Sequence, residues 1–247
     1  MKIDILTLFP EMFVAVTESS MLGRAVEKEI LNINLINIRD FSNDKHNKVD
    51  DTPFGGGVGM VMSADPIFGA LNSIKAKGKK ILYMSPRGKI LDQEKIMKLS
   101  QEEEMIILCG HYEGVDQRVL DYWDMEEISI GDYVLTGGEL PAMVLIDSVA
   151  RLVPEVLGAN ESALEESIYS GLLEYPQYTK PREYQGLNVP EVLFNGNHKL
   201  IGLWKYEKSL ELTKRVRPDL FKKYLDEKKD LTKDEMKILD KITKSNQ

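Results

Sequence analysis

The chain has 247 residues, 43% of them hydrophobic, and a formal net charge of −8, which predicts a soluble protein with one sizeable core and room for a smaller second unit. Its one cysteine, Cys109, lies in an apolar run, so disulfides are excluded and a buried structural thiol in a reducing, cytoplasmic setting is expected. We expect neither a secretory leader nor a membrane span, since no apolar run approaches ~20 residues, and three histidines beside one cysteine form no zinc-type cluster.

Strand-like and helix-like patterns alternate in the first part of the chain. Strands are predicted at residues 3–8 and 30–37, and a helix between them starts at Pro10, because its apolar side chains share one stripe: Met12, Phe13, Val16 and Met21. Residues 41–62 are irregular. Three further helices are predicted, one from Asp65-Pro66 to Ile74, one from Asp92 to Leu99 and one from Met143 to Arg151. Residues 210–242 have a charged helical pattern, so an α/β unit precedes a small helical one.

Three segments place glycine and polar residues after an apolar run, where a core strand would otherwise continue. They are residues 81–88, 106–116 and 129–141. Because loops that follow the strands of an open parallel sheet gather at one edge, these segments predict one pocket lined largely by backbone. A tight turn is the alternative interpretation of any single Gly-Gly pair. The patterns GxxxxGK[ST] and GxGxxG after a strand are missing, which disfavours a nucleoside triphosphate.

A fourth glycine-rich segment lies at residues 50–60, with the sequence DDTPFGGGVGM. Ordering a loop with so many glycines costs backbone entropy. We therefore expect this loop to close over a ligand.

Charge is unevenly distributed in the last third of the chain. No Lys or Arg occurs between Arg151 and Lys180, whereas basic residues outnumber acidic ones from 176 to 225. This distribution predicts an acidic linker followed by a basic carboxyl-terminal unit. The glutamates between Arg151 and Lys180 are Glu155, Glu161, Glu165, Glu166 and Glu174.

Five motifs carry a resemblance to a known family: DTPFGGG at 51–57, CGHYEGVD at 109–116, SIGDYVLTGGE at 129–139, GLLEYPQYTKP at 171–181 and GNH at 196–198. Together they resemble the bacterial tRNA (guanine-N1)-methyltransferases, the TrmD family of the SPOUT class, and the likeness is collinear from Met1 to about Leu220. Methyl transfer from S-adenosylmethionine to N1 of the guanosine just 3′ of the anticodon is implied.

The resemblance also implies an architecture and partners. It implies an α/β fold with a SPOUT-type parallel sheet and a deep trefoil knot, plus a small helical carboxyl-terminal domain. The implied domains are a knotted cofactor-binding domain at 1–157, a flexible acidic linker at 158–173 and a helical tRNA-binding domain at 174–247. The implied partners are tRNA and a second copy of the chain, in a homodimer with composite active sites and no membrane association.

By the same resemblance, the cofactor site falls on the three segments chosen above on physical grounds. Glu113 and Asp132 are equally consistent with holding their own loops. The implied cofactor-binding residues are Tyr83, Ser85, Pro86, Gly110, Tyr112, Glu113, Gly114, Ser129, Ile130, Gly131, Asp132, Tyr133, Val134, Leu135, Gly137, Gly138 and Pro141.

The tRNA-facing residues implied by the resemblance are Gly55, Gly56, Gly57, Gly59, Met60, Lys180, Arg215 and Arg217. Four positions depart from the family's commonest pattern. Phe54 stands where Tyr is usual, Val58 where Pro is usual, and His111 and Lys180 where Arg is usual. Neither His nor Lys offers the guanidinium fork, so bidentate phosphate contacts at these two positions should be weaker.

The implied chemistry defines the catalytic groups. N1 of guanine carries a proton at neutral pH and attacks well only as that proton leaves, which pushes negative charge toward O6, so a carboxylate base and a cation are needed. The family's pattern places the base at Glu166, where Asp is usual, with Glu165 as the alternative, and the cation at Arg151. From composition alone, Glu166 would belong to a solvated linker and Arg151 would cap a helix. Mg²⁺ is implied as well, without assigned ligands.

Two other functions remain open at this stage. A non-enzymatic RNA-binding protein would account for the basic unit, but it needs no glycine-lined pocket. A SPOUT methyltransferase acting on another RNA would share the cofactor segments, whereas the motifs at 55–57 and 171–181 argue against it. Binding of S-adenosylmethionine separates the first of these from an enzyme.

Overall fold

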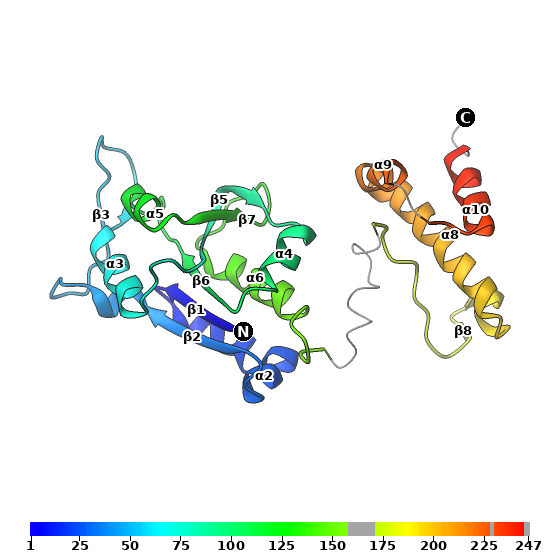
Figure 1. Ribbon diagram of the computed structural model, residues 1–247, viewed down its shortest axis with the longest axis horizontal. Helices are drawn as coiled ribbons and strands as arrows, with labels where there is room; N and C mark the ends of the chain where they lie inside the picture. Colours follow the sequence, from blue (N-terminus) through cyan, green and yellow to red (C-terminus); the bar gives the residue numbers. More distant parts are fainter. Residues whose placement is uncertain (158–170, 228–229, 245–247) are drawn as a thin grey trace. The chain divides into compact units, whose positions relative to one another are not determined.

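The computed structural model describes residues 1–157, 171–227 and 230–244 (Figure 1). The chain divides into two compact units, Met1–Asn160 and Glu161–Gln247. Most of the expected linker at 158–173 lies outside the described residues. Among the described helices, none is both long and apolar enough to cross a membrane.

The first unit is built on a sheet of five parallel strands, as expected. Their order is β2 (Asn32–Asn37), β1 (Lys2–Thr7), β6 (Glu104–Cys109), β5 (Ile81–Ile90) and β7 (Glu126–Ser129). The predicted segments at 106–116 and 129–141 run past the ends of β6 and β7, whereas the segment at 81–88 lies within β5, which continues beyond the expected strand end; β5 lies between β6 and β7 in the sheet. Their carboxyl ends therefore lie at the same edge of the sheet.

Helices cover both faces of the sheet. Side chains of β6 alternate between two buried clusters, with Met105 and Ile107 in one and Ile106 and Leu108 in the other. The first cluster includes residues of α2 (Ser20–Glu27), α4 (Gln93–Leu99) and α6 (Glu139–Ala150). The second includes residues of the 3₁₀ helix η2 (Ile38–Phe41), α3 (Ala64–Ser73) and α5 (Gln117–Trp123). Burial on both sides of the sheet explains the continuous apolar run of the central strand β6 from Met105 to Cys109.

Several predicted boundaries differ from the structure. The single helix predicted from Pro10 is three pieces, η1 (Pro10–Phe13), α1 (Val14–Thr17) and α2, because Ser19 is extended and interrupts the helix. The start at Asp65-Pro66 is wrong: α3 begins at Ala64 after Ser63, and Pro66 fits in the first turn, where its missing N–H is not needed. The irregular stretch 41–62 contains a short antiparallel pair, β3 (Asp50–Asp51) and β4 (Val61–Met62).

Two other helix starts are informative. The prediction at Asp92 is confirmed, since its side chain accepts a hydrogen bond from the Lys95 amide at 2.8 Å and caps α4. The prediction at Met143 is wrong: α6 begins at Glu139, within the segment interpreted as a loop. Pro141 lies in the first turn of α6, where proline is well tolerated.

The second unit is helical, as predicted, and its helices begin earlier than residue 210. It contains β8 (Glu183–Tyr184), β9 (Leu187–Asn188), η3 (Glu191–Phe194), α8 (His198–Val216), α9 (Pro218–Asp226) and α10 (Lys233–Lys244). The Asn197 side chain accepts a hydrogen bond from the Leu200 amide at 3.2 Å and caps α8. A small core of Leu172, Leu210, Phe221, Tyr224 and Ile242 holds these helices together.

Candidate active site

The three predicted segments meet around one cavity of about 260 Å³ at the carboxyl edge of β5, β6 and β7. Every residue that the resemblance assigned to cofactor binding lines this cavity except Asp132. The prediction that the segments build one pocket is confirmed. Five further lining residues lie within the three predicted segments without having been singled out as cofactor-binding residues, namely Met84, Arg87, His111, Val115 and Thr136. Leu120 and Ile128 also line the cavity and lie outside those segments.

An irregularity in β5 forms one wall. Met84 and Lys89 both register with Ile128 of β7, so residues 85–88 leave the ladder between them. The Arg87 amide donates to Ser85 Oγ at 3.2 Å, and the Arg87 guanidinium donates to Glu127 at 2.9 Å. The Ser-Pro-Arg-Gly segment is thus a bulge inside a strand, and it turns Ser85 and Pro86 toward the cavity.

The opposite wall depends on close backbone contact at two glycines. The Gly138 amide donates to the carbonyl oxygen of Gly110 at 2.9 Å. A Cβ at Gly138 would lie 2.8 Å from the Cα of Cys109, and a Cβ at Gly110 would lie 2.7 Å from a ring carbon of Tyr83. Only glycine permits this approach, so the cavity surface here is backbone, which is suited to reading a ligand through N–H and C=O groups.

The segment after β7 supplies apolar side chains at the rim. Ser129 Oγ donates to the carbonyl oxygen of Gly131 at 3.0 Å and accepts from its amide at 3.2 Å, which folds the segment back on itself. Beyond this turn Tyr133, Val134 and Leu135 line the cavity with 55%, 84% and 38% of their surfaces exposed. A bound ligand would cover these side chains and remove apolar surface from water.

A buried carboxylate lies beneath the same wall. Glu139, which is 1% exposed, lies 2.7 Å from His111 Nε2 through Oε2, and Thr7 Oγ1 donates to Oε1 at 2.7 Å. His111 therefore uses one ring nitrogen within the protein, and it lines the cavity beside the Phe9 ring at 4.9 Å between centroids. Neither Glu139 nor Thr7 was foreseen as a partner, since they are 132 positions apart in sequence.

Two ionisable side chains near the cavity are protonated at neutral pH. Burial raises the pKa of the Tyr83 hydroxyl, and burial raises the pKa of the Cys109 thiol well above its usual value. Cys109 is fully buried, which confirms its interpretation as a structural thiol. Among the described lining residues, Glu113 is the one carboxylate.

Of the two predicted catalytic residues, only Arg151 can be placed relative to this cavity. Glu166, and its alternative Glu165, lie outside the described residues. Arg151 is exposed at the carboxyl end of α6 and does not line the cavity. The twelve residues of α6 span about 18 Å at ~1.5 Å per residue, and the other end of the helix, at Gly138, borders the cavity.

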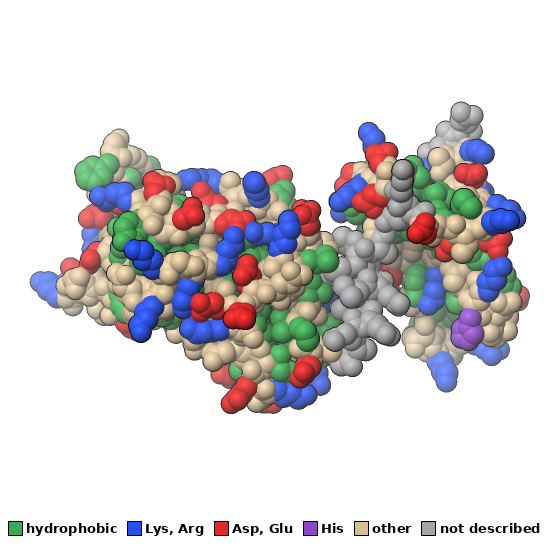
Figure 2. Space-filling model, viewed as in Figure 1, with side chains coloured by type: hydrophobic (Ala, Val, Ile, Leu, Met, Phe, Trp, Pro, Cys, Tyr) green, Lys and Arg blue, Asp and Glu red, His purple; other side chains and the backbone are tan. Residues whose placement is uncertain are grey.

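The glycine-rich loop predicted to face tRNA is joined to the cavity wall. The Glu113 amide donates to the carbonyl oxygen of Met60 at 3.0 Å, and the Met62 amide donates to that of Gly114 at 2.9 Å. The four glycines at 55, 56, 57 and 59 have positive φ, and the tip carries Phe54 and Val58 with 100% and 95% exposure. Figure 2 shows apolar atoms at this tip, so the loop extends an exposed apolar surface from the cavity wall.

The predicted tRNA contacts of the second unit differ in their surroundings. Lys180 and Arg215 are exposed. Arg217 donates two hydrogen bonds to Asp219, at 2.9 and 2.6 Å, and this guanidinium lowers the pKa of Asp219 to about 2. The guanidinium of Arg217 is therefore already engaged, whereas Arg215 forms no ion pair with a carboxylate within the described part of the chain.

The structure provides no candidate metal centre in its described part. Within residues 1–157, 171–227 and 230–244, no group of three or more His, Cys, Asp or Glu side chains is arranged to hold a metal ion. Asp132, assigned to cofactor binding by the resemblance, does not line the cavity.

The fold and the cavity define an α/β protein with a ligand site at the carboxyl edge of neighbouring parallel strands. Comparison with known proteins identifies the family. The family profile described as "tRNA (Guanine-1)-methyltransferase TrmD" matches residues 1–223. The chain belongs to this family, and the resemblance carried by the sequence motifs is confirmed.

Curated relatives match over nearly the whole chain. A tRNA (guanine-N(1)-)-methyltransferase of Clostridium tetani is 54% identical over 239 residues, which cover 96% of this chain and 97% of that protein. One of Clostridium botulinum is 54% identical over 245 residues, covering 99% of both chains. One of Ruminiclostridium cellulolyticum is 55% identical over 226 residues, covering 90% of this chain and 97% of that protein.

Proposed function

We propose that this protein transfers a methyl group from S-adenosylmethionine to N1 of the guanosine just 3′ of the anticodon in tRNA. The observation that carries the proposal is the convergence of three family motifs on one backbone-lined cavity at the edge of the sheet. The family membership supplies the reaction class, and the cavity supplies a place for the methyl donor.

The lining residues fit S-adenosylmethionine. Gly110 and Gly138 leave backbone groups accessible where any Cβ would collide with the wall, which suits hydrogen bonding to an adenine edge or a ribose. Val134 and Leu135 offer apolar surface for the adenine ring. Glu113 places a carboxylate at the cavity, where it would attract the positive charge of the cofactor. When bound, this cofactor supplies an electrophilic methyl group on a positively charged sulfur.

The remaining chemistry belongs to groups that act on guanine. Glu166 accepts the N1 proton, because N1 becomes a good nucleophile only as this proton leaves. The Arg151 guanidinium holds the negative charge that develops at O6. Tyr83 and Cys109 do not compete for the role of base, since burial raises both pKa values.

The position of Arg151 favours an active site shared by two copies of the chain. Within one chain, about 18 Å of helix separates Arg151 from the cavity, and its side chain is too short to close that gap. Four exposed apolar side chains of η1, α1 and α6 are proposed as the apolar patch that meets the second copy; they are Met12, Val14, Leu140 and Val144, with 41–51% exposure each. In a two-fold dimer, Arg151 and Glu166 of one copy would serve the cavity of the other.

Two finer properties are proposed from family membership. A trefoil knot is proposed around the cavity, where the contacts of Gly138 with Gly110 and of Gly88 with the backbone of Glu127 bring segments into close contact. A Mg²⁺ requirement is proposed without assigned ligands. Methyl transfer at a range of Mg²⁺ concentrations, with a chelator control, tests the second point.

The decisive experiment incubates the protein with unmodified tRNA and labelled S-adenosylmethionine, then maps the label by mass spectrometry of nuclease fragments. One methyl group at N1 of the guanosine 3′ of the anticodon is expected. A tRNA with adenosine at that position is the matched control and should stay unlabelled. Label elsewhere would favour another RNA methyltransferase, and tRNA binding without cofactor binding would favour a non-enzymatic RNA-binding protein.

Subunit mixing tests the shared site. Gly138→Val blocks the cavity and Glu166→Gln removes the base, so each homodimer should be inactive. A mixed dimer of the two variants has one site with both parts intact, and about half of the activity per dimer should return by this symmetry. Verified, folded mixed dimers that stay inactive would rule out a site shared across the two copies.

A further inference from the structure

The second unit carries an aromatic cluster that lies outside its core. The rings of Tyr175 and Tyr178, from the segment before β8, lie beside the Trp204 ring of α8, at 6.5 and 6.3 Å between centroids. The core of this unit consists of other residues, around Leu210 and Phe221. The cluster is therefore an addition at the surface, where Tyr178 remains 48% exposed.

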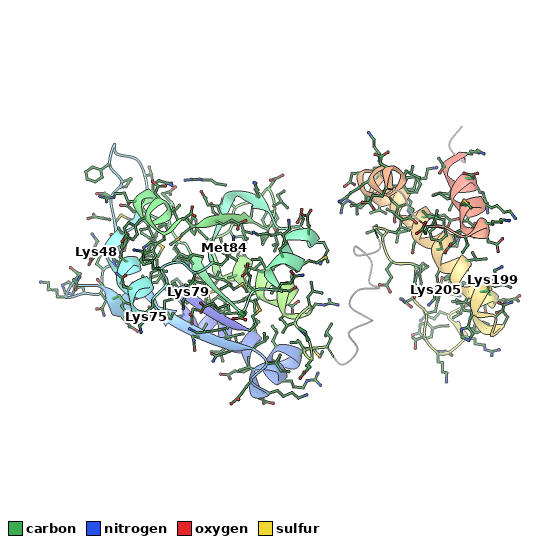
Figure 3. All side chains as sticks on the ribbon, viewed as in Figure 1. Lys48, Lys75, Lys79, Met84, Lys199 and Lys205 are labelled. Atoms are coloured by element: carbon green, nitrogen blue, oxygen red, sulfur yellow. The ribbon has the colours of Figure 1, made fainter. Side chains whose placement is uncertain are left out.

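Cations accompany these rings. Lys205 Nζ lies 4.5 Å from the centroid of the Tyr175 ring, and Arg182 Cζ lies 4.5 Å from that of Phe194. Within the described residues, neither Lys205 nor Arg182 forms an ion pair with a carboxylate. Lys199, labelled with Lys205 on α8 in Figure 3, does pair with Asp234 at 2.7 Å.

This combination has a chemical counterpart in an unpaired nucleotide. A base has a flat π-face that stacks on exposed aromatic rings, and its phosphates attract cations that lack a carboxylate partner. The guanosine beside the anticodon lies in a single-stranded loop of tRNA, where bases are free to leave the stack. A paired duplex hides its base faces and would not use such a surface.

We propose that Tyr178 and Trp204 form a platform on which one unpaired base of the tRNA substrate stacks, with Lys205 contacting a neighbouring phosphate. This inference rests on the proposed function and names a contact that the function alone does not specify. Glu174, Glu183 and Glu191 lie in the same stretch of chain and offset its cations, and Figure 2 shows both signs of charge interspersed on the visible face. The platform should therefore contribute to tRNA binding through base stacking and not through long-range electrostatic attraction of the RNA.

Tryptophan fluorescence tests the contact directly, because the chain has two tryptophans. Trp123 is buried, packs on Tyr122 and Phe68, and has an indole N–H without a hydrogen-bond partner among the described residues. Trp123→Phe keeps an aromatic ring there and leaves Trp204 as the sole reporter. Thermal unfolding and circular dichroism of this background variant confirm that it is folded before any titration.

The probes are an unmodified anticodon stem-loop RNA and a fully paired RNA of equal length. The stem-loop should quench Trp204 emission and the duplex should not. In the same background, Tyr178→Leu should weaken stem-loop binding by about 5- to 160-fold, the range for loss of one stacked base. Tyr178→Phe keeps the ring and should bind within about twofold of the parent, since the stacking surface is retained.

The outcomes separate the two proposals. If tRNA is bound and methylated while Trp204 emission is unchanged and Tyr178→Leu binds like its parent, the platform is refuted and the proposed function stands. Equal quenching by the duplex would also refute a platform for unpaired bases. If the wild-type protein neither binds nor methylates tRNA, both proposals are overturned.

Discussion

Alanine at Gly138 is the smallest change that tests how the cavity wall is built. A Cβ at this position would lie 2.8 Å from the Cα of Cys109 and 2.9 Å from the backbone nitrogen of Gly110, whereas carbon atoms pack comfortably at about 3.5–4.0 Å. Both neighbours are backbone at the end of the buried strand β6, so neither can rotate away. Relief requires the start of α6 to move away from β6 by roughly 0.7 Å or more.

The magnitude follows from this displacement. Overpacking of a close contact costs about 1–3 kcal/mol, and a protein of this size loses about 2–4 °C of Tm for each kcal/mol, so Gly138→Ala should lower Tm by roughly 2–12 °C. Because Gly138 lines the cavity, each 1.4 kcal/mol lost in the bound state should weaken S-adenosylmethionine binding about tenfold. Calorimetric titration and thermal unfolding without cofactor measure the two effects.

A matched control and a chemical reporter complete this test. Gly202 of α8 meets nothing within 4 Å of a Cβ, so Gly202→Ala should leave cofactor affinity unchanged and stabilise the helix by up to about 1 kcal/mol. Burial raises the pKa of the Cys109 thiol, so the native protein should resist alkylation, and displacement of α6 in Gly138→Ala should speed it. Wild-type affinity, Tm and alkylation rate in Gly138→Ala would refute this account of the wall.

Three further predictions concern catalysis, tRNA and pH. Glu166→Gln should reduce turnover by about 10²–10⁴ with cofactor binding near wild type, and Arg151→Lys should lower the rate more than it weakens tRNA binding; near-normal turnover of Glu166→Gln would move the base to Glu165 or elsewhere. Arg215→Ala should reduce the slope of log affinity for tRNA against log salt concentration by about one unit. Arg217→Ala should reduce this slope by less, because Asp219 already engages the Arg217 guanidinium. Equal slopes for the two variants would contradict this distinction. Burial alone would raise the pKa of the Glu126 carboxyl, but its hydrogen bonds and ion pairs with Lys80 and Lys95 outweigh burial and lower the pKa. Glu126→Gln should therefore lower the free energy of unfolding at neutral pH. The difference in stability between the wild type and this variant should shrink as the pH falls below 4.5, the ordinary pKa of a glutamate, because the wild-type carboxylate then becomes protonated.

The pocket could be predicted from sequence because its determinants are local. Each wall segment follows an apolar run, so the strand end and the glycines that follow it are visible side by side in the chain. Parallel strands then bring those ends to one edge without further information. The residues that the resemblance assigned to the cofactor line this cavity except Asp132, because a position in a loop does not fix where a side chain points.

The remaining features depend on contacts between distant residues. The bonds of Glu139 to Thr7 and His111 join three segments, and no local pattern marks a carboxylate that will be buried. The early start of α6 was missed because Gly137-Gly138 and Pro141 are typical of a loop, although proline also suits the first turn of a helix. The ion pair between Arg217 and Asp219 also could not be predicted, because a count of charges does not show which basic side chains are already paired with a carboxylate.

Helix α6 connects the parts of the proposed site, and this has a consequence for Gly138→Ala. The helix begins at the cavity wall, exposes Leu140 and Val144 on the apolar patch, and ends at Arg151. A displacement at its first residue therefore shifts the wall for the cofactor, the surface proposed for the second copy and the cation proposed for guanine O6. Cofactor affinity reports only the first of these. If the shared site is correct, the fold-loss in the rate of methyl transfer at saturating cofactor should exceed the fold-loss in cofactor affinity for Gly138→Ala. Val134→Ala disturbs only the rim of the cavity, so its methyl-transfer rate at saturating cofactor should show no such additional loss.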